Sequence, residues 1–91
     1  GPVLSATKTI ARHHAKQNVL ASAIAPGVVP PPMSEQAAAA AGGVAAFTAN
    51  LAMGEWVPPS DIGNLAAFLA SGACRHLSGA TLDVNGASYI R

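Results

Sequence analysis

The sequence has 91 residues, of which 51% are hydrophobic and 10% are charged, and its formal net charge is +1. Ordinary globular chains carry about 25% charged residues, so this chain has too little charge to cover the surface of a domain of its size. We therefore expect apolar surface to stay exposed unless another polypeptide covers it. The few cations form no long basic stripe, which excludes nucleic acid as an expected ligand.

The chain lacks the usual signs of a secreted, metal-binding or membrane protein. Cys74 is the only cysteine, so neither an intrachain disulfide nor a zinc cluster can form, and we expect the reducing cytoplasm as its location. His13 and His14 are adjacent and point about 100° apart on a helix, so we expect no metal site. No signal peptide is visible, and the longest uncharged run, 36–54, is too rich in alanine and glycine for an expected membrane span.

The first half of the sequence predicts a helix, a strand and a long loop. Pro2 suits the first turn of a helix over 1–17, in which lysine and arginine recur every four residues as one polar stripe. Residues 19–25, VLASAIA, form a nearly continuous apolar run that is typical of a strand buried on both faces. The prolines that follow exclude a central strand, so 26–57 is predicted as a loop region with short helices within 35–41 and 44–53.

The second half predicts a helix over 59–71 and a strand over 80–84. Asp61 places an acid in the first turn of this helix, and apolar residues recur at helical spacing after it. A strand, a crossover helix and a second strand form a βαβ unit with parallel strands. Because two strands cannot be covered on both faces by so few helices, we expect this unit to be the edge of a larger sheet.

Several blocks of sequence resemble the short-chain dehydrogenase/reductase family. They follow one another in the family's order and span nearly the whole chain: Thr7–Arg12, Ala23–Val29, Pro59–Ile62, Phe68–Ser71 and Leu77–Gly86. The resemblance implies an α/β fold, namely the C-terminal βαβ portion of a Rossmann-type doubly wound parallel sheet, preceded by one helix. It also implies a role in moving a hydride between NAD or NADP and a carbonyl or alcohol substrate.

The resemblance assigns no catalytic residue to this chain. In the family, a glycine-rich turn binds the cofactor pyrophosphate, and a serine, a tyrosine and a lysine transfer the proton. Along the alignment the lysine falls immediately before Gly1, and the serine, the tyrosine and the glycine-rich turn have no counterpart here. Tyr89 is no substitute, because it follows the last strand and has no lysine four residues later.

Three residues are implied as cofactor contacts on the nicotinamide side. Pro26 and Gly27 match the family's Pro-Gly pair, and Val29 is the position whose main-chain groups contact the carboxamide. A strand terminator would require the same Pro-Gly pair, so both interpretations stay open. Two departures from the family pattern, Ser22 for asparagine and Pro31 for threonine, put orthodox cofactor binding in doubt.

The remaining expectations concern substrate, partners and alternatives. Residues 30–56 match the variable loop that covers a small-molecule substrate, or they only pack onto the body of the protein. The resemblance implies a homo-oligomer, dimer or tetramer, and an N-terminal part of the same fold that supplies the chemistry. The alternative function is a non-catalytic binding or assembly module, and a third possibility is a membrane-surface protein that uses the alanine-rich loop.

Overall fold

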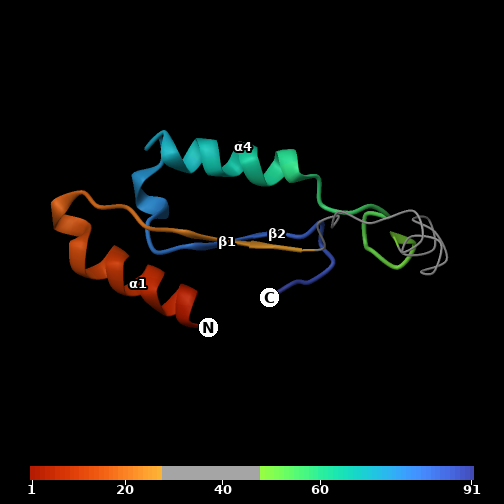
Figure 1. Ribbon diagram of the computed structural model, residues 1–91, viewed down its shortest axis with the longest axis horizontal. Helices are drawn as coiled ribbons and strands as arrows, with labels where there is room; N and C mark the ends of the chain where they lie inside the picture. Colours follow the sequence, from red (N-terminus) through yellow and green to blue (C-terminus); the bar gives the residue numbers. More distant parts are fainter. Residues whose placement is uncertain (28–47) are drawn as a thin grey trace, which may run out of the picture.

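The computed structural model describes residues 1–27 and 48–91. In this part of the chain, two parallel strands lie between two helices, which approach the strand pair from opposite sides (Figure 1). The elements are α1 (Pro2–His14), the 3-10 turn η1 (Ala15–Gln17), β1 (Ala23–Pro26), α4 (Pro59–Ala70), the 3-10 turn η2 (Arg75–Leu77) and β2 (Thr81–Val84). The α/β βαβ unit preceded by one helix is therefore confirmed. Among the described helices, none is long and apolar enough to cross a bilayer.

Helix α1 is closed at both ends by the residue types that the sequence places there. Pro2 occupies the first turn, and the positive charge of Arg12 in the last turn interacts favourably with the negative end of the helix dipole. The α-helix ends at His14, and residues up to Gln17 continue as the tighter turn η1. The last three residues of the predicted helix over 1–17 thus form a 3-10 turn, which the spacing of residue types in the sequence does not indicate.

Asn18 terminates this turn and ties it to a distant part of the chain. Its backbone is left-handed, with a φ of 61°, a conformation that asparagine tolerates better than most residues. Its side-chain oxygen accepts hydrogen bonds from Arg75 Nε at 3.0 Å and from Arg75 Nη2 at 2.8 Å. Asn18 therefore joins the end of α1 to η2.

Substitutions at Asn18 separate the contribution of its left-handed backbone from that of its hydrogen bonds to Arg75. We expect Asn18→Gly to lose only the hydrogen bonds to Arg75, and Asn18→Ala to lose these and to add left-handed strain of about 1 kcal/mol. Thermal melting of the protein that carries this chain should rank the wild type first, glycine second and alanine third. An alanine variant as stable as the glycine variant would show that the φ of 61° does not matter.

Strand β1 begins at Ala23 rather than at Val19. Before it, the Ser78 hydroxyl accepts a hydrogen bond from the Ala21 N–H at 3.0 Å, and the Ser22 hydroxyl donates to the Leu77 carbonyl at 2.9 Å. These side-chain bonds add to one backbone bond, in which the Gly79 N–H donates to the Ala21 carbonyl at 2.6 Å. Val19 is 42% exposed and so is not buried on both faces as predicted.

The two strands pair in parallel from Ala23 opposite Thr81 to Pro26 opposite Val84. Ala23 N–H donates to the Ala80 carbonyl at 3.0 Å and Gly27 N–H donates to the Val84 carbonyl at 2.9 Å. Because peptide groups alternate in direction along a strand, Ile24 and Pro26 face the other edge of β1. No described residue pairs with that edge.

The described residues build only a small core. The buried side chains are Ala11, Ala23, Thr48 and Val57, and no described large side chain is fully buried. Helix α4 has no buried residue. Several large apolar side chains are instead exposed, among them Phe68 at 47%, Val3 at 73% and Ile90 at 79%. The expectation of exposed apolar surface is confirmed.

Candidate functional site

Two of the three residues implied as cofactor contacts, Pro26 and Gly27, lie where the parallel strands end. Pro26 is the last residue of β1 and Gly27 follows it, while Asn85 and Gly86 follow β2. This is the right-hand end of the strand pair in Figure 1. In open α/β sheets, ligands bind in the crevice outside the carboxyl ends of the strands. The position therefore suits a ligand site. Val29 lies outside the described residues, as do the predicted helix over 35–41 and most of the predicted loop.

Gly27 is packed against the chain that leaves the neighbouring strand. A Cβ atom at Gly27 would lie 2.6 Å from Asn85 Cβ and 2.8 Å from Asn85 Cα. Neither atom is the far end of a flexible side chain, so the backbone would have to shift. The structure thus provides a packing reason for this glycine that is independent of any ligand.

The peptide groups at Pro26 and Gly27 leave few donors for a cofactor. The Gly27 N–H is already bonded to the Val84 carbonyl, and proline has no N–H. The side of Gly27 that lacks a Cβ is filled by Asn85 rather than open. These two residues shape the end of the sheet, and any donor for the nicotinamide carboxamide must come from elsewhere.

The end of β2 is braced by the segment that precedes α4. Gly86 has a φ of +58°, and a Cβ there would lie 3.0 Å from Met53 Sδ. The Ala52 N–H donates to the Ser88 hydroxyl at 3.2 Å, and Asn85 Nδ2 donates to the Tyr89 carbonyl at 2.9 Å. The Asn85 side chain therefore holds the C-terminal tail.

A small cavity of about 70 Å³ lies beside this end of β2. Its lining combines apolar side chains with two carboxylates: Met53, Glu55, Trp56, Val57, Pro58, Asp61, Val84 and Gly86. Both carboxylates are exposed, and no lysine, histidine or cysteine lies among the lining residues. This arrangement can bound part of a ligand.

The sequence gives no sign that Asn85 belongs to this site, whereas Met53 lies within the segment 30–56 that is predicted to cover the substrate. A contact between Gly27 and Asn85 depends on the register of two strands that are distant in sequence. This register cannot be predicted from a local sequence pattern.

Comparisons with known proteins find relatives that match nearly the whole chain. Residues 1–87 match the family model described as enoyl-(acyl carrier protein) reductase. The 3-oxoacyl-(acyl-carrier-protein) reductase FabG of Vibrio harveyi is 33% identical over 88 residues, which are 97% of this chain and 35% of that protein.

Solved structures have the same fold. The RhlG/NADP active-site complex of Pseudomonas aeruginosa matches with a TM-score of 0.80 and 24% identity, over 97% of this chain and 36% of that one. A 4-hydroxyisoleucine dehydrogenase complexed with NADH matches with a TM-score of 0.77 and 25% identity, over 93% of this chain and 35% of that one.

The chain spans about a third of the length of the curated relative that it matches. The matched part contains the helix, the parallel strand pair and the crossover helix that the structure describes. The match over residues 1–87 and the shared fold together show that the chain belongs to the short-chain dehydrogenase/reductase family.

Proposed function

We propose that this chain is the C-terminal portion of an NAD(P)-dependent oxidoreductase that acts on a carbonyl or alcohol substrate. The observation that carries the proposal is the unpaired edge of β1. The backbone N–H and carbonyl of Ile24 face that edge, and the residues of β1 on both sides of Ile24 are apolar. No described residue pairs with this edge. A strand that is apolar on both faces belongs inside a parallel sheet, so the rest of a Rossmann sheet is expected at this edge.

The chemistry belongs to the part of the fold that is added at this edge. In the family, that part contributes the glycine-rich turn and the Ser, Tyr and Lys that transfer the proton. The present chain contributes the end of the sheet at Pro26 and Gly27, the cofactor contact at Val29 and the substrate loop within 26–57. The cofactor is NAD or NADP, since the similar solved structures are complexes with NADH and with NADP.

The small cavity beside β2 supports a substrate role for the segment before α4. Met53 and Trp56 contribute apolar surface next to the carboxyl end of β2, where a substrate would approach the nicotinamide. The family model and the Vibrio harveyi relative both carry names that refer to acyl carrier protein substrates.

Exposed apolar groups on α4 and the C-terminal tail support a homo-oligomer, a dimer or a tetramer. Phe68, Tyr89 and Ile90 are 47%, 67% and 79% exposed, and no described segment covers them. Burial of such side chains against a second copy would remove them from water. The single exposed Cys74 suits the reducing cytoplasm.

Denaturing mass spectrometry of the native protein, followed by a cofactor assay, tests the proposal. We expect either a polypeptide larger than 9.0 kDa or a second chain that carries the glycine-rich turn and the Tyr/Lys pair. Carbonyl-dependent oxidation of NADH or NADPH should accompany it. A native protein that consists of the 9.0 kDa chain alone would contradict the proposal.

A non-catalytic binding or assembly module is the second candidate. Pro31 stands where the family has a hydroxyl-bearing threonine, so one cofactor contact is lost. Under this alternative the native protein keeps its oligomeric state but binds neither NADH nor NADPH. Equilibrium dialysis with both cofactors distinguishes the two candidates.

A further inference from the structure

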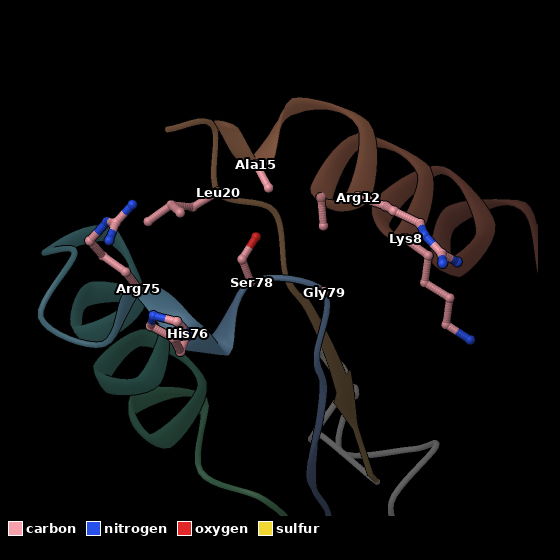
Figure 2. A pocket seen from close by; sticks show the side chains of 9 residues that line it. Lys8, Arg12, Ala15, Leu20, Arg75, His76, Ser78 and Gly79 are labelled. Atoms are coloured by element: carbon pink, nitrogen blue, oxygen red, sulfur yellow. The ribbon is translucent and has the colours of Figure 1, made fainter. Parts of the chain in front are cut away.

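A cavity of about 560 Å³ opens between helix α1 and the segment that leads into β2 (Figure 2). We call it the basic cavity, and it is lined by Lys8, Ala11, Arg12, Ala15, Leu20, Arg75, His76, Ser78 and Gly79. Three of the chain's five lysine and arginine residues line it, and none of the acidic residues in the described part of the chain does. In a chain with so few charges, this concentration of one sign sets the cavity apart.

The basic groups come from two opposite walls. Lys8 and Arg12 extend from α1, whereas Arg75 and His76 lie on η2, and the Ser78 hydroxyl lies between the walls (Figure 2). The Arg75 guanidinium is held in place by its two hydrogen bonds to the Asn18 side-chain oxygen. The cavity thus has basic side chains on both sides, while the Ser78 hydroxyl between them is bonded to the Ala21 N–H and carbonyl.

The charges of the helix wall are not neutralised within the described chain. Lys8 and Arg12 are four residues apart on one helix, where like charges repel. Neither side chain has a hydrogen bond or ion pair to a described residue. The ion pair among the described residues joins Arg91 to Asp83, away from the cavity. An anion between the walls would relieve this repulsion.

The basic cavity is distinct from the cofactor end of the sheet. Its residues precede the strands, Leu20 before β1 and Gly79 before β2, whereas Pro26 and Gly27 follow β1. Ser78 and Gly79 lie in the segment that leads into β2, on the side of β1 away from its free edge, so a strand that pairs with that edge leaves this wall in place. The inference therefore does not depend on the proposed dehydrogenase activity.

We infer that the basic cavity binds an organic anion that carries two linked phosphoryl groups. Its volume falls within the range of about 300 to 1,000 Å³ that is typical of small-molecule sites. Guanidinium and ammonium groups are the side chains that best bind phosphate oxygens. A ligand with two linked phosphoryl groups can contact the basic groups of both walls with separate groups, which a single phosphate cannot do.

Calorimetric titration of the native protein with inorganic pyrophosphate tests this inference. Saturable binding with one site per chain is expected at physiological salt. Arg12→Gln removes a lining charge that has no described partner, and we expect it to weaken binding about tenfold or more. Lys16→Gln is the matched control, because Lys16 lies in η1 next to the cavity but does not line it, and it should change affinity less than twofold.

Further titrations test whether the anion binds outside the cofactor site and which kind of anion is preferred. Binding should persist when NADPH saturates the protein, and inorganic phosphate and malonate should bind more weakly than pyrophosphate. The inference fails if no saturable binding occurs, if Lys16→Gln weakens binding as much as Arg12→Gln, or if NADPH displaces pyrophosphate. Equal affinity for malonate would also contradict it, since the phosphoryl chemistry would then not be selected.

Discussion

The isolated 91-residue chain is expected to show helical circular dichroism without cooperative thermal unfolding, and to bind neither NADH nor NADPH. Its described core consists of small or medium side chains, Ala11, Ala23, Thr48 and Val57, while large apolar side chains are exposed. A two-stranded sheet is at best marginally stable in water unless further strands or helices cover it. The chain should therefore form a molten or aggregated state.

Binding of a hydrophobic dye and calorimetry check this expectation. A molten state exposes apolar surface, binds the dye strongly and gives no sharp heat-capacity peak. Addition of a polypeptide that contains the rest of the Rossmann sheet should suppress dye binding and restore a cooperative transition. A monomeric 91-residue sample with a sharp, reversible transition would contradict this expectation.

Gly27→Ala in the native protein is expected to destabilise the fold by about 2 kcal/mol or more, through overpacking at the end of the sheet. The new methyl group would lie 2.6 Å from Asn85 Cβ, and the backbone next to it would have to shift. Since Gly27 also donates the last ladder bond to Val84, the shift would weaken pairing at the strand ends.

Gly63→Ala is the matched control for this substitution. Gly63 lies in α4, and no atom lies within 4 Å of the position that its Cβ would occupy. Alanine there should stabilise the helix by roughly 1 kcal/mol, because glycine is the poorer helix former. Chemical denaturation of both variants without cofactor gives the comparison. If Gly27→Ala lost cofactor affinity but no stability, the glycine would serve cofactor approach rather than packing.

The elements that depend on local signals could be predicted from the sequence. Pro2 and Asp61 mark helix starts, and the structure places α1 from Pro2 and α4 from Pro59. The order helix, strand, helix, strand predicts the parallel pairing, which follows from the need for a crossover. The family resemblance was carried by these same segments.

Features that depend on contacts between distant segments could not be predicted. The apolar run from Val19 gives no sign that the hydroxyls of Ser22 and Ser78 join the two segments that precede the strands. Likewise, Lys8 and Arg12 were interpreted as part of a solvated stripe. They line a cavity only because η2 brings Arg75 and His76 opposite them.

The central claim is that β1 is an interior strand whose free edge pairs with the rest of a Rossmann sheet. Amide hydrogen exchange at Ile24 in the native protein tests this claim most directly, because its N–H faces that edge and no described residue accepts it. We predict strong protection, comparable to that of Ala25, whose N–H faces β2. Exchange at Ile24 as fast as at an exposed loop amide, with Ala25 still protected, would make β1 an edge strand and contradict the claim.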